Sequence, residues 1–168
     1  MEEDRKYLLA AFEEAEKSLK EGTYPIGAVI VNSIGEIVSK GRNKVFSECD
    51  TTSHAEVDAI RIASQLMLDM ENKKYKKREL TLYTTCEPCP MCSGAILLSF
   101  SIKRVVWAAN DISMGAMRKL KQEPLFIDRF SDISIEAAPI KELEDRQRRL
   151  MAEFFSNRGR IRTEWHDG

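Results

Sequence analysis

The sequence has no long apolar run, no excess of charge of one sign and no signal-like start. No stretch approaches the roughly 20 consecutive apolar residues that a membrane-spanning helix needs. The formal net charge is −1, so composition gives no general electrostatic reason to expect nucleic-acid binding. The opening MEEDRKYLLAAF lacks the basic start and apolar centre of a secretory signal peptide. These absences favour a cytoplasmic protein that does not act on a membrane.

Cysteine is also scarce, yet three of the four cysteines fall within the eight residues TCEPCPMC. In a reducing compartment, clustered thiols bind metal more often than they form disulfides. A Cys-x-x-Cys pair alone does not separate a redox device from part of a metal site. Three interpretations are therefore open: a redox pair, a structural zinc knuckle and a catalytic metal centre.

The chain has no internal repeat and no long linker rich in Pro, Gly or Ser, so we expect one domain over residues 1–168. Apolar residues at helical spacing predict a first helix that ends near Gly22. Further helices are expected over 54–68 and 91–100 and from about 139, and strands over 26–32, 36–41, 80–85, 103–109 and 132–138. The first two strands form a hairpin, and strands and helices alternate after it. This order predicts an α/β protein in which helices cover both faces of a mixed five-stranded sheet, an α/β/α sandwich of three layers.

Two smaller expectations concern connections. Thr51, Thr52 or Ser53 is expected to cap the helix over 54–68, because side-chain oxygens of these residue types accept hydrogen bonds from the first helical N–H groups. The polar, basic segment 71–79 is expected to be a solvated loop.

His54, Cys89 and Cys92 together offer one imidazole and two thiols. A structural zinc site closes its coordination sphere with four protein ligands, whereas three protein ligands and an open position are typical of catalytic zinc. Cys89 and Cys92 are three residues apart and share one face at a helix start, where the helix dipole stabilises thiolates. His54 begins another helix. If these helices are parallel neighbours on one face of the sheet, their N-termini can meet at one ion.

Glu56 follows the expected histidine ligand by two residues, in the first helical turn. This spacing puts it about 200° round the helix from His54, but a long side chain in the first turn can fold back towards the metal. There it could take a proton from an activated water and pass it to a leaving nitrogen. A zinc-stabilised nucleic-acid-binding module and an inactive partner subunit are the competing hypotheses. Neither needs this carboxylate, so Glu56 favours an enzyme.

The motifs HAE at 54–56 and PCPMC at 88–92 resemble the H-x-E…P-C-x-x-C signature of the cytidine/deoxycytidylate deaminase superfamily. The stretches YPIGAVIV, GRN, SHAEVDAIR, LYTTCEPCPMCSGAI and IKRVVWAAND also follow the order of its branch of tRNA adenosine, guanine and cytosine deaminases. The resemblance covers residues 5–158. It implies a cytidine deaminase-like fold, one Zn²⁺ per chain, a homodimer, and Glu56 as the proton carrier. The implied reaction hydrolyses an exocyclic amino group to a carbonyl and releases ammonia.

The same resemblance suggests residues that contact the substrate. Asn43, within GRN, would hydrogen-bond the base, and Asn110 or Asp111 would line the pocket. The ending RTEWHDG resembles the C-terminus of fungal cytosine deaminase, so Trp165 and Asp167 are expected to cap the pocket. The alternatives are an ordinary turn residue for Asn43 and an unstructured tail for the last residues.

The substrate is less clearly indicated by the sequence. CEPCPMC resembles guanine deaminases, while YPIGAV resembles the cytosine and tRNA enzymes. The stretches GRNKVF and DISMGAM lack the proline and the basic residue that the tRNA enzymes often carry there. A protein that binds a polynucleotide gains affinity when its basic side chains neutralise phosphates, whereas a protein that binds a small base needs a closed, mostly apolar pocket. We therefore expect a free nucleobase or nucleoside of the cytosine or guanine type, with the wobble adenosine of tRNA as the alternative.

Overall fold

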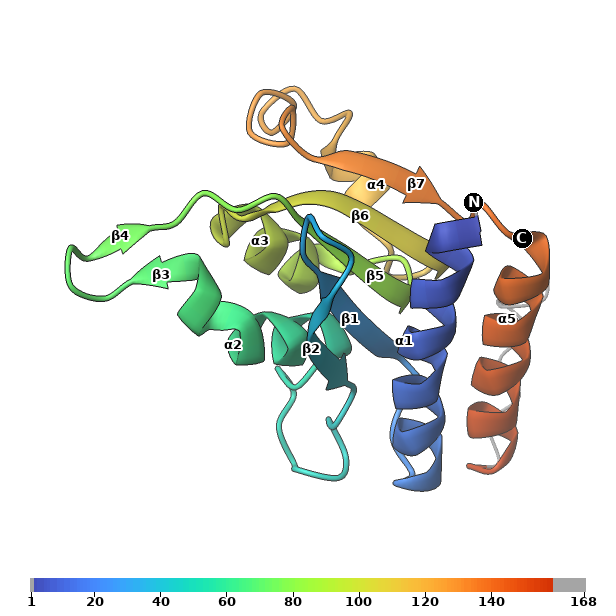
Figure 1. Ribbon diagram of the computed structural model, residues 1–168. Coiled ribbons are helices and arrows are strands. Elements are labelled where there is room, and N and C mark those ends of the chain that lie inside the picture. Colours follow the sequence, from blue (N-terminus) through green and yellow to red (C-terminus); the bar gives the residue numbers. More distant parts are fainter. Residues whose placement is uncertain (1, 159–168) are drawn as a thin grey trace.

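A computed structural model describes residues 2–158 of the chain (Figure 1). Its elements follow in the order α1 (Glu2–Lys20), β1 (Gly27–Val31), β2 (Ile37–Arg42), α2 (Ala55–Met67), β3 (Leu68–Asp69), β4 (Lys74–Tyr75), β5 (Leu80–Cys86), α3 (Pro90–Leu98), β6 (Ile102–Ala109), α4 (Met117–Leu120), β7 (Ser134–Ala137) and α5 (Lys141–Ser156). No helix among these is long and apolar enough to span a bilayer.

The main sheet has five strands in the order β2-β1-β5-β6-β7. Strand β1 pairs antiparallel with both β2 and β5, whereas the β5–β6 and β6–β7 pairs are parallel. The predicted mixed five-stranded sheet is therefore confirmed. Since β5 and β6 run in parallel, the segments that follow them leave the sheet at the same edge, where α/β folds usually bind ligands.

Helices cover both faces of this sheet, with α1 and α5 on one side and α2 and α3 on the other (Figure 1). All five residues of β1 are buried, as expected for a strand with helices over both faces. Ala28 and Ile30 pack in the core cluster beneath α2 and α3, while Val29 and Val31 pack in the cluster beneath α1 and α5. The three-layer arrangement follows from this alternation and confirms the predicted fold class.

Helix α2 lies unusually close to strand β2, and Gly41 makes this possible. A Cβ atom on Gly41 would lie 2.3 Å from the Ala55 carbonyl oxygen and 2.3 Å from the Ala59 nitrogen. Ala55, Ala59 and Ala63 present small buried side chains to the same contact. The first turn of α2, which carries the candidate site, is therefore held directly against the sheet.

Segment 71–79 differs from the expected plain loop. Leu68 and Asp69 pair with Tyr75 and Lys74 in a short antiparallel hairpin that projects from the body. The Tyr75 ring packs on Phe100 with 4.6 Å between ring centroids, a contact that the local sequence pattern did not indicate. The short helix α4 was also not predicted, because four residues carry too little periodicity to recognise.

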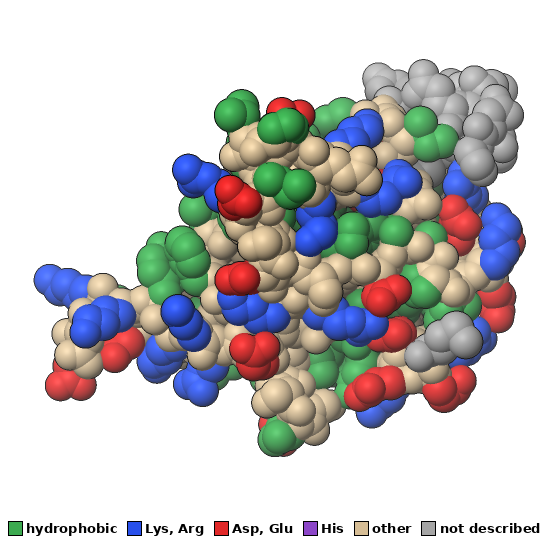
Figure 2. All heavy atoms as spheres, turned by 90° about the horizontal axis from the view of Figure 1, so that it is seen from above, with side chains coloured by type: hydrophobic (Ala, Val, Ile, Leu, Met, Phe, Trp, Pro, Cys, Tyr) green, Lys and Arg blue, Asp and Glu red, His purple; other side chains and the backbone are tan. Residues whose placement is uncertain are grey.

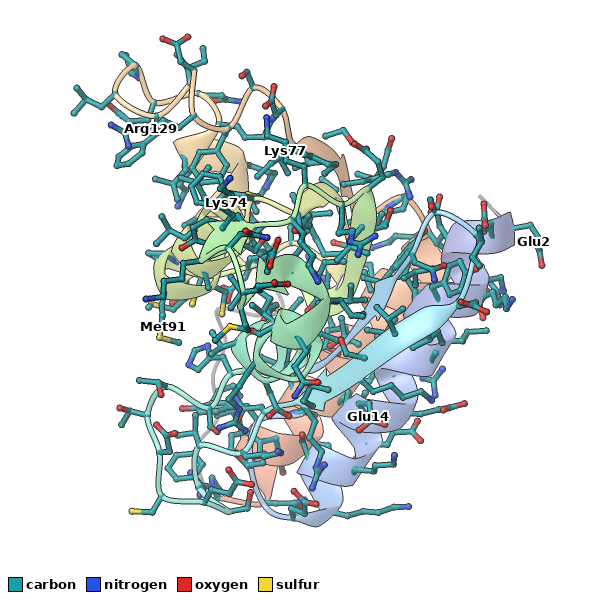
Figure 3. All side chains as sticks on the ribbon, turned by 60° about the vertical axis from the view of Figure 1, so that its left-hand side comes forward. Glu2, Glu14, Lys74, Lys77, Met91 and Arg129 are labelled. Carbon is teal, nitrogen blue, oxygen red and sulfur yellow. The ribbon has the colours of Figure 1, made fainter. Side chains whose placement is uncertain are left out.

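Charged side chains of both signs are interspersed on the face of the molecule that Figure 2 shows. On the face in Figure 2, Lys and Arg lie among Asp and Glu, including on the hairpin at the left. Figure 3 places Lys74 and Met91 on the side of α2 and α3, away from α1 with Glu2 and Glu14. This face offers no continuous basic area for a polyanion.

Candidate active site

Two helix N-termini bring the candidate ligands together. His54 is the N-cap residue of α2, and Cys89 is the N-cap residue of α3, which follows β5. Neither side chain makes a capping hydrogen bond, so both are available to a ligand. The ligand atoms of His54, Cys89 and Cys92 all lie within 4.8 Å of one another. The expectation that one of residues 51–53 caps α2 was wrong, because the helix starts one residue later and His54 takes that position.

The separations among these three side chains fit a zinc ion. Nδ1 of His54 lies 3.6 Å from Sγ of Cys89 and 3.6 Å from Sγ of Cys92. With typical bonds of about 2.3 Å to sulfur and about 2.0 Å to nitrogen, a tetrahedral zinc site puts these atoms about 3.6 Å apart. One imidazole and two thiols also form a donor set that binds zinc better than it binds harder cations.

The electrostatics of the thiols favour a cation at the same place. The neighbouring Cys92 side chain and, after it, the His54 ring stabilise the Cys89 thiolate and lower the pKa of Cys89 to about 4. The same Cys89 sulfur raises the pKa of His54 and the pKa of Cys92. Zinc binds deprotonated cysteine and neutral histidine, so a bound zinc ion would displace the protons of this group.

Glu56 lies beside this group and is only 3% exposed. Its Oε2 accepts a hydrogen bond from Cys92 Sγ at 3.4 Å, and its Oε1 accepts one from Thr84 Oγ1 at 3.1 Å. Burial raises the pKa of the carboxyl above its ordinary value. Thr84 belongs to β5, so the sheet and α2 together orient the Glu56 side chain.

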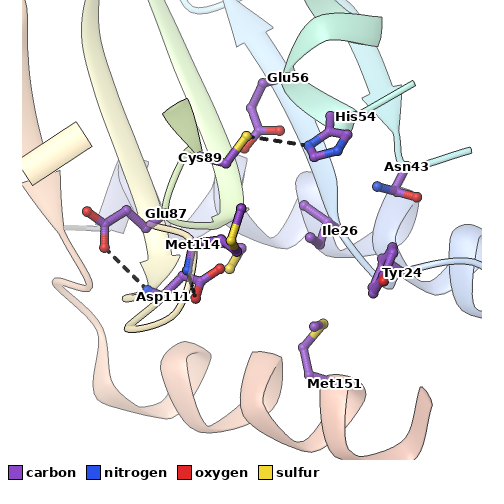
Figure 4. A pocket seen from close by; sticks show the side chains of 11 residues that line it. Tyr24, Ile26, Asn43, His54, Glu56, Glu87, Cys89, Asp111, Met114 and Met151 are labelled. Atoms are coloured by element: carbon purple, nitrogen blue, oxygen red, sulfur yellow. Dashed lines mark hydrogen bonds between the residues drawn. The ribbon is translucent and has the colours of Figure 1, made fainter. Parts of the chain in front are cut away.

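A cavity of about 340 Å³ opens next to the group (Figure 4). His54, Glu56 and Cys89 line one end of it. Its other walls are largely apolar, and they come from Tyr24, Ile26, Met114 and Met151. A mostly apolar cavity with a few directed polar groups is typical of a small-molecule site.

The residues expected to contact a substrate have different placements. Asn43 and Asp111 both line the cavity. The side-chain oxygen of Asn110 instead accepts a hydrogen bond from Trp107 Nε1 at 2.9 Å, and Asn110 is not among the lining residues. Trp165 and Asp167 lie outside the described residues, so their expected capping role stays a prediction.

Several lining residues were missed by the sequence reasoning. Met151 comes from α5 and Met114 from the loop after β6, and nothing in their local patterns indicated a ligand site. Cys86, the cysteine that precedes the ligand pair, is buried and also lines the cavity, and burial raises its pKa. It therefore stays a neutral thiol.

Glu87 organises the loop that carries Asp111 and Met114. Its carboxylate accepts hydrogen bonds from the backbone nitrogen of Asp111 at 3.3 Å and from Arg118 Nη2 at 2.9 Å. A Cβ on Gly115 would lie 2.5 Å from Glu87 Oε2, so the loop needs glycine there. This ion pair between buried Glu87 and partly exposed Arg118 holds one wall of the cavity.

Comparisons with known proteins agree with this geometry. Residues 1–109 match the family described as the cytidine and deoxycytidylate deaminase zinc-binding region. The tRNA-specific adenosine deaminase of Haemophilus influenzae is 40% identical over 114 residues, covering 68% of this chain and 62% of that protein, less than two thirds of its length. The cytosine deaminase of Candida albicans is 35% identical over 143 residues, covering 83% of this chain and 91% of that one. A solved structure from a study of A-to-I editing by tRNA:A34 deaminases has a TM-score of 0.71 at 25% identity and covers 85% of this chain and 99% of its own.

Proposed function

Since this chain belongs to the cytidine and deoxycytidylate deaminase family, we propose that it deaminates a free nucleobase or nucleoside of the cytosine or guanine type. It is a zinc-dependent hydrolase that acts on carbon–nitrogen bonds. The single observation that carries the proposal is the buried Glu56 carboxylate, which lies beside the His54, Cys89 and Cys92 group at the end of a small cavity.

The roles of the side chains follow from their positions. His54, Cys89 and Cys92 would hold the zinc ion. When bound, zinc lowers the pKa of a coordinated water towards about 7 and so supplies a nucleophile at neutral pH. Glu56 would take a proton of the attacking water at Oε2 and deliver it to the amino nitrogen, which leaves as ammonia, while the water oxygen stays on the ring carbon as the carbonyl. Thr84 holds the other carboxylate oxygen and keeps Oε2 aimed at the site.

The form of the cavity supports a small substrate. Its volume is about 340 Å³, and Asn43 and Asp111 are polar groups on otherwise largely apolar walls. A flat heterocycle can be enclosed there and oriented by few hydrogen bonds. The alternative is a tRNA adenosine, and it is favoured by the similarity to the tRNA-specific adenosine deaminases of Haemophilus influenzae and Aquifex aeolicus.

An ammonia-release screen tests the substrate proposal. Zinc-loaded protein is given cytosine, isocytosine, guanine, adenine and their nucleosides, with tRNA in parallel. We expect ammonia from at least one free base or nucleoside, and release that is about 10²- to 10⁴-fold slower from the same compound with Glu56→Gln protein. Activity on tRNA alone would contradict the free-base proposal and support the alternative.

We also propose that the protein acts in the cytoplasm. All four cysteines lie within the described residues and are free thiols. Thiolate ligands require reduced cysteines, which a reducing compartment maintains.

The chain is further proposed to act as a homodimer through the outer side of α2 and α3. Large apolar side chains are exposed there, namely Ile62, Leu66, Leu98 and Phe100, with Tyr75 of the hairpin packed on Phe100. Large apolar side chains exposed on neighbouring elements are typical of an interface. No part of the described fold covers it.

A charged residue within this face should separate the subunits. Leu98 is 62% exposed, so Leu98→Glu is expected to leave the fold intact and convert a dimer into a monomer, as measured by light scattering after gel filtration. The matched control is Leu125→Glu, at a leucine that is 80% exposed outside this face, and it should remain dimeric. A monomeric wild type, or a dimeric Leu98→Glu protein, would rule out this interface.

A further inference from the structure

The backbone of Asn43 is fixed from two sides at the point where β2 ends. Its nitrogen donates a hydrogen bond to the Ile26 carbonyl oxygen at 2.9 Å. Its carbonyl oxygen accepts a hydrogen bond from the buried Ser18 hydroxyl at 2.8 Å. The residue is 1% exposed, so the remaining freedom of this position is the orientation of its side-chain amide.

That orientation is determined by hydrogen-bond chemistry. The backbone nitrogen of Val45 lies 3.1 Å from Asn43 Oδ1 and can only donate, so the amide atom next to it has to be the oxygen. Thr23 Oγ1 lies 2.7 Å from the same oxygen and accepts a hydrogen bond from the Phe46 nitrogen at 3.3 Å. Its one proton is therefore directed to Asn43 Oδ1. Turning the amide over would place two donors against each other at Val45.

The amide nitrogen is consequently the end that faces the cavity. Figure 4 shows it turned towards the pocket, with the oxygen on the other side. Within residues 2–158, no protein group accepts a hydrogen bond from this nitrogen. The cavity wall thus presents a hydrogen-bond donor of fixed direction.

We propose that Thr23 is a positioning residue that locks the Asn43 amide, so that the site selects substrates with a hydrogen-bond acceptor at this position. A ring nitrogen lone pair or a ring carbonyl oxygen meets that requirement, and an N–H group does not. The inference rests on the proposed function, because it describes how that site recognises its substrate. Thr23 itself is fully buried and acts only through Asn43.

The variant Thr23→Val keeps the shape of the side chain and removes its hydroxyl. Without that donor, the Asn43 amide is held by the Val45 nitrogen alone and samples other orientations. We expect KM for the best base in the ammonia screen to rise about 3- to 10-fold, the effect of one hydrogen bond. Zinc content and kcat should change less than about 2-fold, because an interaction present before and during the reaction affects binding alone. Thr23→Ser restores the hydroxyl and should restore KM.

Ser18→Ala is the matched control. It removes an equally buried hydroxyl that donates to the backbone oxygen of the same asparagine and leaves the side-chain amide contacts in place. Its thermal stability is expected to fall, while its KM stays at the wild-type value. An unchanged KM in Thr23→Val would contradict the proposal that Thr23 fixes the Asn43 amide. A rise of KM in Ser18→Ala as large as that in Thr23→Val would also contradict it.

Side-chain amide signals of ¹⁵N-labelled protein separate this inference from the proposed function. The Asn43 NH₂ pair is identified by its loss in Asn43→Asp. We expect it to broaden or shift in Thr23→Val and to return in Thr23→Ser. If wild-type protein deaminates no base, the proposed function fails. The NH₂ signals still test whether Thr23 fixes the orientation of the Asn43 amide. Asn43 NH₂ signals that are unchanged in Thr23→Val would refute the positioning role of Thr23.

Discussion

Glu56→Gln is expected to lower ammonia release by about 10²- to 10⁴-fold, the usual contribution of a positioned general acid–base group. The amide has nearly the shape of the carboxylate and can still accept the Thr84 hydrogen bond, but it cannot carry a proton to the leaving nitrogen. The protein should keep about one zinc per chain, because Glu56 lies beside the ligand group and is not part of it. Ammonia release and metal analysis on the same preparation measure both effects.

Asp58→Asn provides the control for this result. Asp58 is a second buried carboxylate of α2, but it pairs with Lys44 and Arg61 and does not line the cavity. Its loss should reduce thermal stability and leave kcat close to the wild-type value. Turnover by Glu56→Gln at the wild-type rate would exclude the proposed proton-transfer role.

Cys89→Ser is expected to lose zinc and, with it, essentially all deaminase activity. Serine is a far poorer zinc ligand than a thiolate, and the site offers only His54 and Cys92 as the other ligands of its group. Treating the wild type with a strong chelator should have the same effect, and added zinc should restore activity. Metal analysis and the ammonia assay follow both changes.

Cys86→Ala is the matched variant for the metal prediction. Cys86 lies three residues before Cys89 and lines the same cavity, but it is not in the ligand group. The Cys86→Ala protein should retain about one zinc per chain, whatever effect the substitution has on substrate binding. Full zinc content in Cys89→Ser would show that the metal is held elsewhere.

The sequence by itself determined the sheet and the composition of the metal group. Alternating strand and helix patterns predicted five strands with helices on both faces, and that arrangement is present. The spacing of Cys89 and Cys92 is a local property of one helix start, so it could be recognised without the fold. His54 could be joined to them only by assuming that α2 and α3 are neighbours, and the structure confirms this assumption.

Only the tertiary structure decided which surfaces meet around the cavity. Met151 reaches it from α5 at the far end of the chain, and Asn110, next to the lining residue Asp111, bonds to Trp107 instead. The direction of the Asn43 amide depends on a hydroxyl twenty residues earlier in the sequence. Periodicity and spacing describe contacts within one element, whereas the contacts around the cavity depend on how separate elements pack. That packing is fixed by the whole core rather than by any local pattern.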